Sequence, residues 1–268
     1  MSYKNDSAIR QLLNDLLKKD LSQDVIDLIE GFRQRNIYSK SIDIYGDGIG
    51  HVDYVNHMGD DLSVVNSARV SFGVEKEELD GRDKKLINYL IKHKHTSTLE
   101  HNLITFRFCV PMFVRSQHHR HRTWSYNEIS RRYTDVNINF YEPKEFRTQH
   151  KSNRQASNAE ELINPQVEWD KTTAYQAITH HHQKSLTLFN TLIDAGVCRE
   201  QARGVLPQNL YTEYYGTVNL SNLLKFIDLR THEGAQWEIQ KVAEACLEIA
   251  TDLFPVTVGA YRRIRGEE

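Results

Sequence analysis

The chain has 268 residues, of which 39% are hydrophobic and 26% charged, and its formal net charge is −2. These values are typical of a globular protein, and they argue against disorder, a collagen-like repeat and a general affinity for nucleic acid or acidic lipid. No apolar run approaches the ~20 residues of a membrane helix, and the N-terminus lacks the apolar stretch of a signal peptide. The three scattered cysteines predict neither a disulfide framework nor a zinc site, so we expect a reduced, cytoplasmic protein without membrane contact.

The N-terminal part of the chain combines helical and strand-like patterns. Apolar residues at helical spacing predict two short helices between residues 7 and 34, and we interpret residues 1–38 as a helical extension of a domain over 39–268. Alternating residues around the turn Gly46–Gly48 predict a hairpin over 42–55. Further helices are expected over 61–69, where Asp60 is the cap, and over 82–94.

The clearest strand covers residues 103–110. Ile104, Phe106 and Phe108 alternate with polar side chains, and Pro111 ends the run. A short helix is predicted near 113–119, a polar segment without a clean period follows over 120–134, and the polar residues 141–164 are interpreted as an irregular surface insertion.

Helical patterns dominate the second half of the sequence. Asn164-Pro165 is expected to open a long helix that ends at Gly196. A short helix (199–205), an extended segment (210–218), a helix capped by Asn219 and a final helix (236–253) are predicted after it. The pattern indicates an α+β fold, rich in helix, with one small and mainly antiparallel sheet.

An arginine-rich segment, residues 115–133, is the first candidate for function. It holds five arginines and a single acidic residue, Glu128, together with Trp124, Tyr126 and Tyr133. Arginine forks suit phosphate, whereas a merely solvated basic loop would not need three large rings. The segment therefore predicts a site for a phosphorylated small molecule. A surface that binds nucleic acid is a weaker alternative, because the remainder of the chain is net acidic.

Metal and nucleophile chemistry receive less support. The sequence has no HExxH motif, and consecutive side chains on a helix point about 100° apart, so His180, His181 and His182 cannot hold one ion. We expect these three to be exposed helix histidines, and no metal is predicted. The cysteines have no basic neighbours in sequence that would lower their pKa values, so an enzyme of this sequence would depend on a bound cofactor. The glycine-rich nucleotide-binding motifs are absent.

The stretch Arg120–Tyr133, which reads RHRTWSYNEISRRY, resembles the RHRxxSxNxxSxRY signature of flavin-dependent thymidylate synthases. The likeness spans roughly residues 41–254, so we interpret 39–268 as the catalytic domain. The resemblance implies an α+β enzyme that carries out FAD-dependent reductive methylation of dUMP to dTMP. Methylenetetrahydrofolate would donate the carbon, NADPH would be the reductant, and a homotetramer would form its active sites where subunits meet. The alternative is a catalytically idle relative that binds nucleotides or single-stranded nucleic acid.

The resemblance also implies residue roles. Arg230 matches the arginine that meets the uracil ring, where a cation would favour the N3-deprotonated pyrimidine. We take it as the catalytic residue. The positions that match the family's contacts to dUMP are Gln117, Arg120, Glu128, Ser130, Arg131, Arg132, Arg203 and Arg230.

The positions that match the family's FAD contacts are Ser97, Arg120, His121, Arg122, Asn127, Glu128, Asn219, Ser221 and Lys225, with His95 and Ser71 as further ones. Ser221, Lys225 and Gly234 depart from the residues usual in the family, so the contacts with the flavin are expected to differ at these positions. Asn219 also stands where a helix N-cap belongs.

Overall fold

The structure is a computed structural model that describes residues 23, 25, 40–154, 156–167 and 171–267. The chain divides into two compact units, Met1–Lys40 and Ser41–Glu268. The two helices predicted between residues 7 and 34 lie outside the described residues, apart from Gln23 and Val25, which are helical. Both β-sheets that the structure describes belong to the second unit, Ser41–Glu268.

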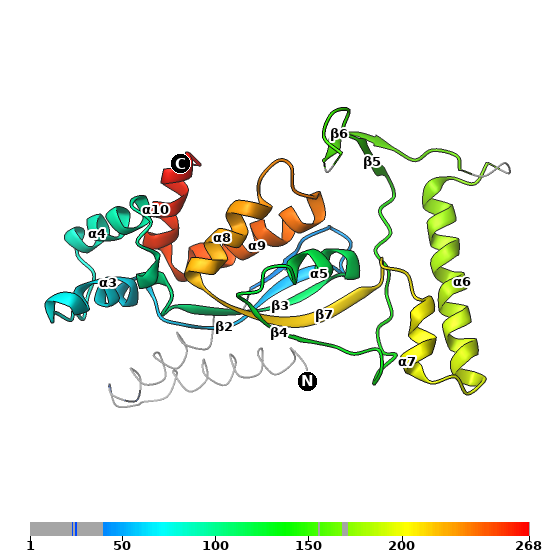
Figure 1. Cartoon of the computed structure of the whole chain (residues 1–268), viewed down its shortest axis with the longest axis horizontal. Coiled ribbons are helices and arrows are strands. Elements are labelled where there is room, and N and C mark those ends of the chain that lie inside the picture. Colours follow the sequence, from blue (N-terminus) through cyan, green and yellow to red (C-terminus); the bar gives the residue numbers. More distant parts are fainter. Residues whose placement is uncertain (1–22, 24, 26–39, 155, 168–170, 268) are drawn as a thin grey trace. The chain divides into compact units, whose positions relative to one another are not determined.

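An antiparallel sheet of five strands forms the centre of this unit (Figure 1). The predicted α+β class is confirmed, and the alternation in β3 is confirmed as well: Ile104, Phe106, Phe108 and Val110 are all 0% exposed. The strands, in their order across the sheet, are β1 (Ser41–Asp43), β2 (His51–Met58), β3 (Leu103–Pro111), β7 (Tyr211–Asn219) and β4 (Ser125–Glu128).

The long pairing of β3 with β7 sets the register of the sheet. It runs without a shift from Leu103 opposite Asn219 to Pro111 opposite Tyr211. Gly216 lies within this pairing, and a Cβ there would come 2.8 Å from the ring of Phe108. A glycine at this place lets the large rings pack against the backbone of β7.

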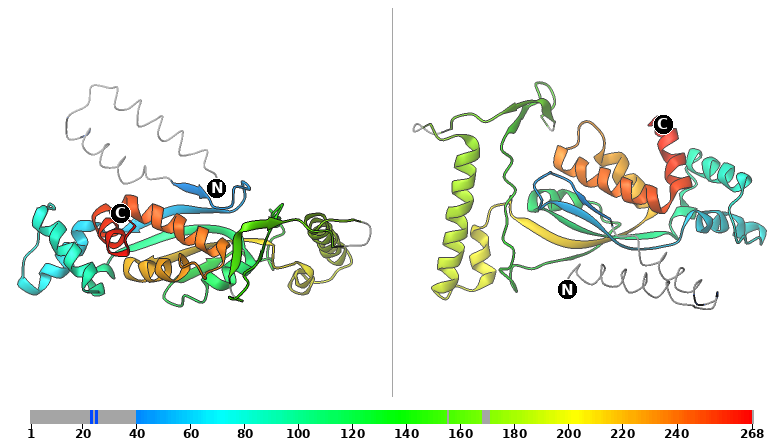
Figure 2. Two further views of the ribbon diagram at one scale, coloured as in Figure 1. Left: turned by 90° about the horizontal axis from the view of Figure 1, so that it is seen from above. Right: turned by 180° about the vertical axis from the view of Figure 1, so that it is seen from behind.

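Helices α8 and α9 lie next to each other over the sheet (Figures 1 and 2). Val242, Cys246 and Ile249 of α9 are fully buried, which gives that helix its core face. Asp61 ties α10 to α3, because its carboxylate accepts from the backbone N–H groups of Val256 and Thr257 at 2.8 Å each. The helices are α3 (Asp61–Arg69), α4 (Gly81–Lys92), α5 (Met112–His118), α6 (Ala174–Asp194), α7 (Arg199–Ala202), α8 (Leu220–Arg230), α9 (Trp237–Leu253) and α10 (Pro255–Arg265), with short 3-10 turns η1 (Val70–Phe72), η2 (Thr96–Leu99) and η3 (Arg203–Val205).

Two polar segments contain strands that the sequence did not indicate. β4 forms within the segment 120–134 because the free edge of β7 offers it backbone partners, from Ser125 opposite Thr217 to Glu128 opposite Tyr214. The insertion 141–164 is not irregular, since β5 (Phe146–Gln149) pairs with β6 (Ser157–Ile163) as a separate two-stranded sheet. None of the described side chains of these two strands is buried, so they do not show the hydrophobic alternation that marks a strand.

Two helix boundaries also differ from the prediction. The long helix does not open at Asn164-Pro165; α6 begins at Ala174, where Thr173 and Gln176 form a capping box. Asn164 instead accepts a hydrogen bond from the N–H of Tyr175 at 3.0 Å. The helix over 236–253 is not the last, because Pro255 occupies the first turn of α10 and fits there without a lost hydrogen bond.

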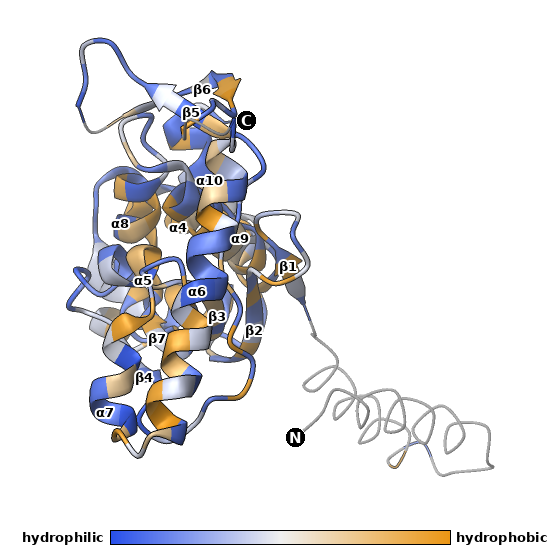
Figure 3. Cartoon of the chain, turned by 90° about the vertical axis from the view of Figure 1, so that its right-hand side faces the viewer, coloured by the Kyte–Doolittle hydropathy of each residue, from blue (hydrophilic) through white to orange (hydrophobic). Residues whose placement is uncertain are grey.

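Helix α6 lies beside α7, beyond one end of the sheet (Figure 1). His180 and His181 are exposed as expected, but His182 is buried: its Nδ1 lies 2.7 Å from a carboxylate oxygen of Glu142. Orange stretches of the α6 ribbon in Figure 3 mark apolar residues. Leu188 of this helix is 47% exposed. None of the described helices is long and apolar enough to cross a membrane.

Candidate functional site

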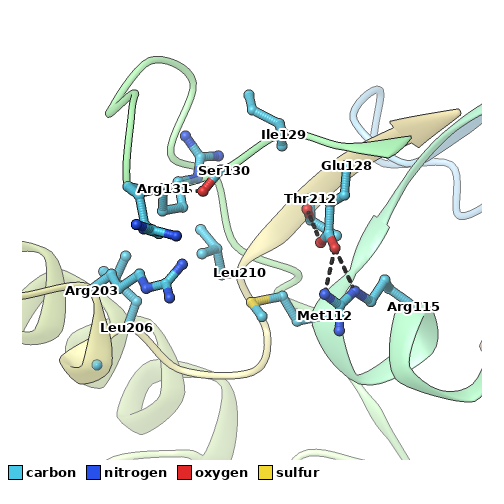
Figure 4. Close-up of a pocket in the computed structure, with 12 residues that line it drawn as sticks. Met112, Arg115, Glu128, Ile129, Ser130, Arg131, Arg203, Leu206, Leu210 and Thr212 are labelled. Atoms are coloured by element: carbon cyan, nitrogen blue, oxygen red, sulfur yellow. Dashed lines mark hydrogen bonds and ion pairs between the residues drawn. The ribbon is translucent and has the colours of Figure 1, made fainter. Parts of the chain in front are cut away.

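A cavity of about 570 Å³ opens where β4, the N-terminal end of α5 and η3 come together (Figure 4). It is lined by residues 128–132 of the arginine-rich segment and by Arg203, which lies 71 residues after Arg132. We call it the arginine cavity. Its lining residues are Met112, Arg115, Glu128, Ile129, Ser130, Arg131, Arg132, Arg203, Gly204, Leu206, Leu210 and Thr212.

Glu128 is the acidic residue of the cavity, and it is held by two neighbours. The guanidinium of Arg115 donates to Oε2 through both Nε, at 2.8 Å, and Nη2. The Thr212 hydroxyl donates to Oε1 at 2.7 Å. Figure 4 shows this group on one side of the cavity, with Ser130 and Arg203 on the other. The negative charge of Glu128 is therefore matched by Arg115 and does not neutralise the remaining arginines.

Arg131 holds the loop that follows β4. Its Nη1 donates to the carbonyl of Val136 at 2.6 Å, and its Nη2 donates to the carbonyls of Asn137 and Tyr211. Only Nε lacks a partner in the described part of the chain, and the side chain is 9% exposed. In this chain alone, Arg131 mainly shapes the loop that carries Ser130 and Arg132.

Arg132 and Arg203 are the available cations of the arginine cavity. Both are exposed, and neither guanidinium forms an ion pair within the described ranges. The Ser130 hydroxyl accepts from the backbone N–H of Arg132 at 3.3 Å, which leaves its own proton free to donate. Two unpaired guanidinium groups and a hydroxyl around one cavity fit a phosphate dianion.

A second cluster of predicted residues surrounds Arg230, at the C-terminal end of α8. Arg230 Nε donates to His121 Nε2 at 3.0 Å, and Nη2 donates to the backbone carbonyl of Gln117 at 3.3 Å. Burial and, second, the positive charge of Arg230 lower the pKa of His121 to about 4, so the imidazole is neutral near pH 7 and can accept this hydrogen bond. These two contacts orient the Arg230 guanidinium. Burial lowers the pKa of Arg230.

The neutral histidines predict a pH dependence of stability. The folded chain holds the pKa of His121 near 4 against an ordinary value of 6.5, so the unfolded chain takes up the proton first as pH falls. The free energy of unfolding is expected to decrease from pH 7 to pH 5, and buried His118, whose pKa burial also lowers, acts in the same direction. Denaturant unfolding at pH 5, 6 and 7 measures this. His121→Gln should reduce the slope, whereas His181→Gln on the exposed face of α6 should not; equal slopes in wild type and His121→Gln would contradict the assignment.

A third group of predicted residues lies at the Asn219 end of β7, where α8 begins. Asn219 is the N-cap of α8, and its side chain accepts from the N–H of Asn222 at 2.9 Å. The N–H of Leu220 donates to Asn102, just after η2, and thereby brings the turn of Ser97 next to this helix start. Lys225 is exposed, whereas Ser221 is only 2% exposed and its hydroxyl has no hydrogen-bond partner among the described residues.

The predicted residues therefore do not surround one space within a single chain. Thr212 of the arginine cavity and Asn219 of the third group are seven residues apart on the continuous strand β7. At the usual rise of a strand this separates them by roughly 24 Å. Asn127 lies between these ends, opposite Tyr215, whereas Arg120 and Arg122 lie in the turn before β4; all three are exposed.

The thiols are not prepared for nucleophilic attack. Burial raises the pKa of Cys109 to about 12, and it also raises the pKa of the fully buried Cys246. Cys198 is exposed, and its thiol donates to Gln201 Oε1 at 3.6 Å. Within the described ranges no group of His, Cys, Asp or Glu is arranged to hold a metal ion.

The sequence did not indicate which residues hold the binding side chains in place. Arg115 is one of the five arginines of the segment and has no predicted role, and no role is predicted for Thr212 either. A lone glutamate among arginines could have suggested an internal ion pair. Thr212 could not have been found in this way, because its contact with Glu128 crosses 84 positions of sequence.

Comparison with known proteins shows the family of this chain. The sequence model of a family described as thymidylate synthase complementing protein matches residues 53–256. A flavin-dependent thymidylate synthase from Thermus thermophilus is 42% identical over 212 residues, which are 79% of this chain and 75% of that protein. The chain belongs to the flavin-dependent thymidylate synthase family. The corresponding protein of Thermotoga neapolitana is 40% identical and is covered to 90% of its length.

Solved structures show the same fold. A UMP/dUMP methylase, PolB from Streptomyces cacaoi, bound with 5-Br dUMP, superposes with a TM-score of 0.69 at 34% identity, over 79% of this chain and 94% of that one. The structure of the same methylase bound with 5-Br UMP gives a TM-score of 0.66. Membership of the flavin-dependent thymidylate synthase family makes this chain an enzyme, a flavin-dependent methyltransferase.

Proposed function

We propose that this chain converts dUMP to dTMP, with methylenetetrahydrofolate as carbon donor, FAD as cofactor and NADPH as reductant. The observation that carries the proposal is the arginine cavity, where Arg132 and Arg203 form no ion pair within the described residues and the Ser130 hydroxyl keeps a proton to donate. The raised pKa values of Cys109 and Cys246 support a reaction that needs no protein thiolate.

In this proposal the phosphate of dUMP lies between Arg132 and Arg203 and accepts from the Ser130 hydroxyl. Glu128 keeps unused lone pairs beside its bonds to Arg115 and Thr212, so it can accept from a ribose hydroxyl. Arg131 contributes through the loop it holds and through its free Nε. The PolB methylase, which is similar to this chain, has been solved with 5-Br dUMP and with 5-Br UMP bound.

Arg230 is assigned to the uracil ring. A guanidinium beside the ring favours the pyrimidine with N3 deprotonated, which makes C5 a better carbon nucleophile. The neutral His121 holds the Nε edge of Arg230 and the Gln117 carbonyl holds one Nη group, so the cation is fixed before substrate arrives. Gln117 and Arg120 complete the dUMP contacts.

The residues assigned to FAD fit its polar parts. Arg120 and Arg122 form no ion pair in the part of the chain that is described, so they can neutralise the flavin's diphosphate. The exposed Ser97, Asn127 and Lys225 offer further hydrogen bonds, whereas Ser221, also assigned to FAD, is 2% exposed and its hydroxyl is buried. When bound and reduced, the flavin supplies the hydride. The other residues assigned to this cofactor are His121, Glu128 and Asn219.

We also propose that the complete site is shared between subunits of a homotetramer. The separation of roughly 24 Å along β7 supports this, because one chain does not bring the phosphate side and the flavin side together. The exposed apolar residues on α6, such as Leu188, offer a surface for association. The proposed compartment is the cytoplasm, where the three free cysteines stay reduced.

The reaction is tested by anaerobic incubation with dUMP, methylenetetrahydrofolate, NADPH and FAD, omitting one component at a time. We expect dTMP only in the complete mixture, because each component supplies a different part of the product. dTMP formed at an unchanged rate by flavin-free protein would contradict the proposal.

A further inference from the structure

Glu238, near the start of α9, is a buried carboxylate outside the arginine cavity, and it is 4% exposed. Its Oε1 accepts from Arg147 Nη2 at 2.7 Å and from the Tyr141 hydroxyl at 3.1 Å. Burial and, second, the charge of Glu238 raise the pKa of Tyr141, so the phenol remains a donor. The other oxygen, Oε2, faces the side chain of Gln236 at 2.9 Å.

Because a carboxylate accepts hydrogen bonds, Glu238 determines the orientation of the side-chain amides of Gln236 and Gln117. A carboxylate beside a guanidinium only accepts hydrogen bonds, so Gln236 must present its NH2 group to Glu238. The carbonyl of the Gln236 side chain then points the other way, where it accepts from Gln117 Nε2. Gln117 must therefore direct its own NH2 inward, and its Oε1 makes no hydrogen bond within the described ranges.

We propose that Glu238, through Gln236, is a positioning residue that fixes the amide of Gln117 so that it presents an acceptor oxygen, and not a donor NH2, to dUMP. The inference rests on the proposed function, which places Gln117 against the nucleotide. The partner of Gln117 Oε1 is then the 3′-hydroxyl of dUMP, which stays a donor when N3 of the uracil ring is deprotonated. Two residues of the 141–164 segment, Tyr141 and Arg147, anchor the carboxylate.

Glu238→Gln is expected to reverse the relay. Arg147 and Tyr141 are donors, so they hold the carbonyl oxygen of the new amide, whose NH2 then faces Gln236. Gln236 turns over, and Gln117 follows and presents its NH2 to the nucleotide. Because an acceptor contact is replaced by a mismatched donor, we expect the dissociation constant of dUMP to rise about tenfold.

A second substitution distinguishes reversal from simple damage. Gln117→Glu alone places a carboxylate against the Gln236 carbonyl, so it should lower both dUMP affinity and melting temperature. Combined with Glu238→Gln, the same carboxylate meets the NH2 of the reversed Gln236 and again offers an acceptor to dUMP. The double variant should bind dUMP more tightly and melt at a higher temperature than Gln117→Glu alone.

The experiment uses the full chain loaded with its flavin, with calorimetric titration of dUMP and thermal melting of every variant. Glu244→Gln is the matched control, since it removes a charge from the exposed side of the same helix and should leave dUMP affinity unchanged. Losses that add in the double variant, in both affinity and melting temperature, would overturn the relay. If the wild type itself does not bind dUMP, the proposed function fails, whereas the melting temperatures still test the relay alone.

Discussion

Arg230→Ala is expected to lower kcat by about a hundredfold or more, while the flavin stays bound. The reason is that a fixed cation at the developing negative charge of the reacting ring stabilises the transition state more than the ground state. Arg230 is held by the neutral His121 at 3.0 Å and by the Gln117 carbonyl at 3.3 Å, so its position costs little reorganisation during the reaction. Turnover and flavin absorbance of the purified variant measure the two effects separately, and dUMP affinity is measured beside them.

The matched control for this variant is Arg265→Ala. Arg265 donates to the Thr231 hydroxyl at 2.8 Å, beside the same helix end, but its described contacts do not include His121 or Gln117. It should lower stability and leave kcat close to wild type. Equal losses of flavin and turnover in Arg230→Ala would instead show that Arg230 only completes the end of α8.

Arg203→Ala is expected to raise the dissociation constant of dUMP by about 10- to 100-fold, because a charge-assisted contact to the phosphate contributes roughly 1.5–3 kcal/mol. Arg203 has no ion-pair partner in the described part of the chain, so its removal leaves no carboxylate unpaired and should cost little stability. Arg199→Ala is the control: it lies on α7 just before Arg203, pairs with Asp135 at 3.0 Å and does not line the cavity. Unchanged affinity in Arg203→Ala would remove the phosphate assignment.

Arg203→Ala and Arg230→Ala together test the shared site. If Arg203 and Arg230 reach one nucleotide from different subunits, hybrid oligomers of Arg203→Ala and Arg230→Ala chains contain some sites with both arginines intact. Co-expressed hybrids should then recover turnover above that of either variant alone. The absence of any recovery in isolated hybrids would place both arginines of a site in the same chain.

The fold was largely predictable where local patterns are strong. The alternation of residues 103–110 reflects a strand with one buried face, and the caps Asp60 and Asn219 satisfy helix N–H groups with their own side chains. The strand β4 and the hairpin β5–β6 could not be found in this way. Their residues pair because a distant edge or neighbouring strand is available, and their side chains carry no buried alternation.

The candidate site was predictable in residue type but not in arrangement. The concentration of arginines around Glu128 indicated an anion site, and the structure leaves Arg132 and Arg203 available for one. Sequence did not show that Arg131 is largely used by backbone carbonyls. Nor did it show the buried Glu238, whose contacts with Tyr141 and Arg147 cross 97 and 91 positions.

A single-turnover reaction tests the central claim most directly. The full chain is loaded with FAD, reduced anaerobically, freed from excess reductant and mixed with dUMP and methylenetetrahydrofolate. The account predicts dTMP in an amount equal to the reduced flavin, with reoxidation of the flavin at the same rate. Stable reduced flavin and no dTMP, from protein that binds dUMP, would contradict the assignment of this chain as a thymidylate-forming methyltransferase.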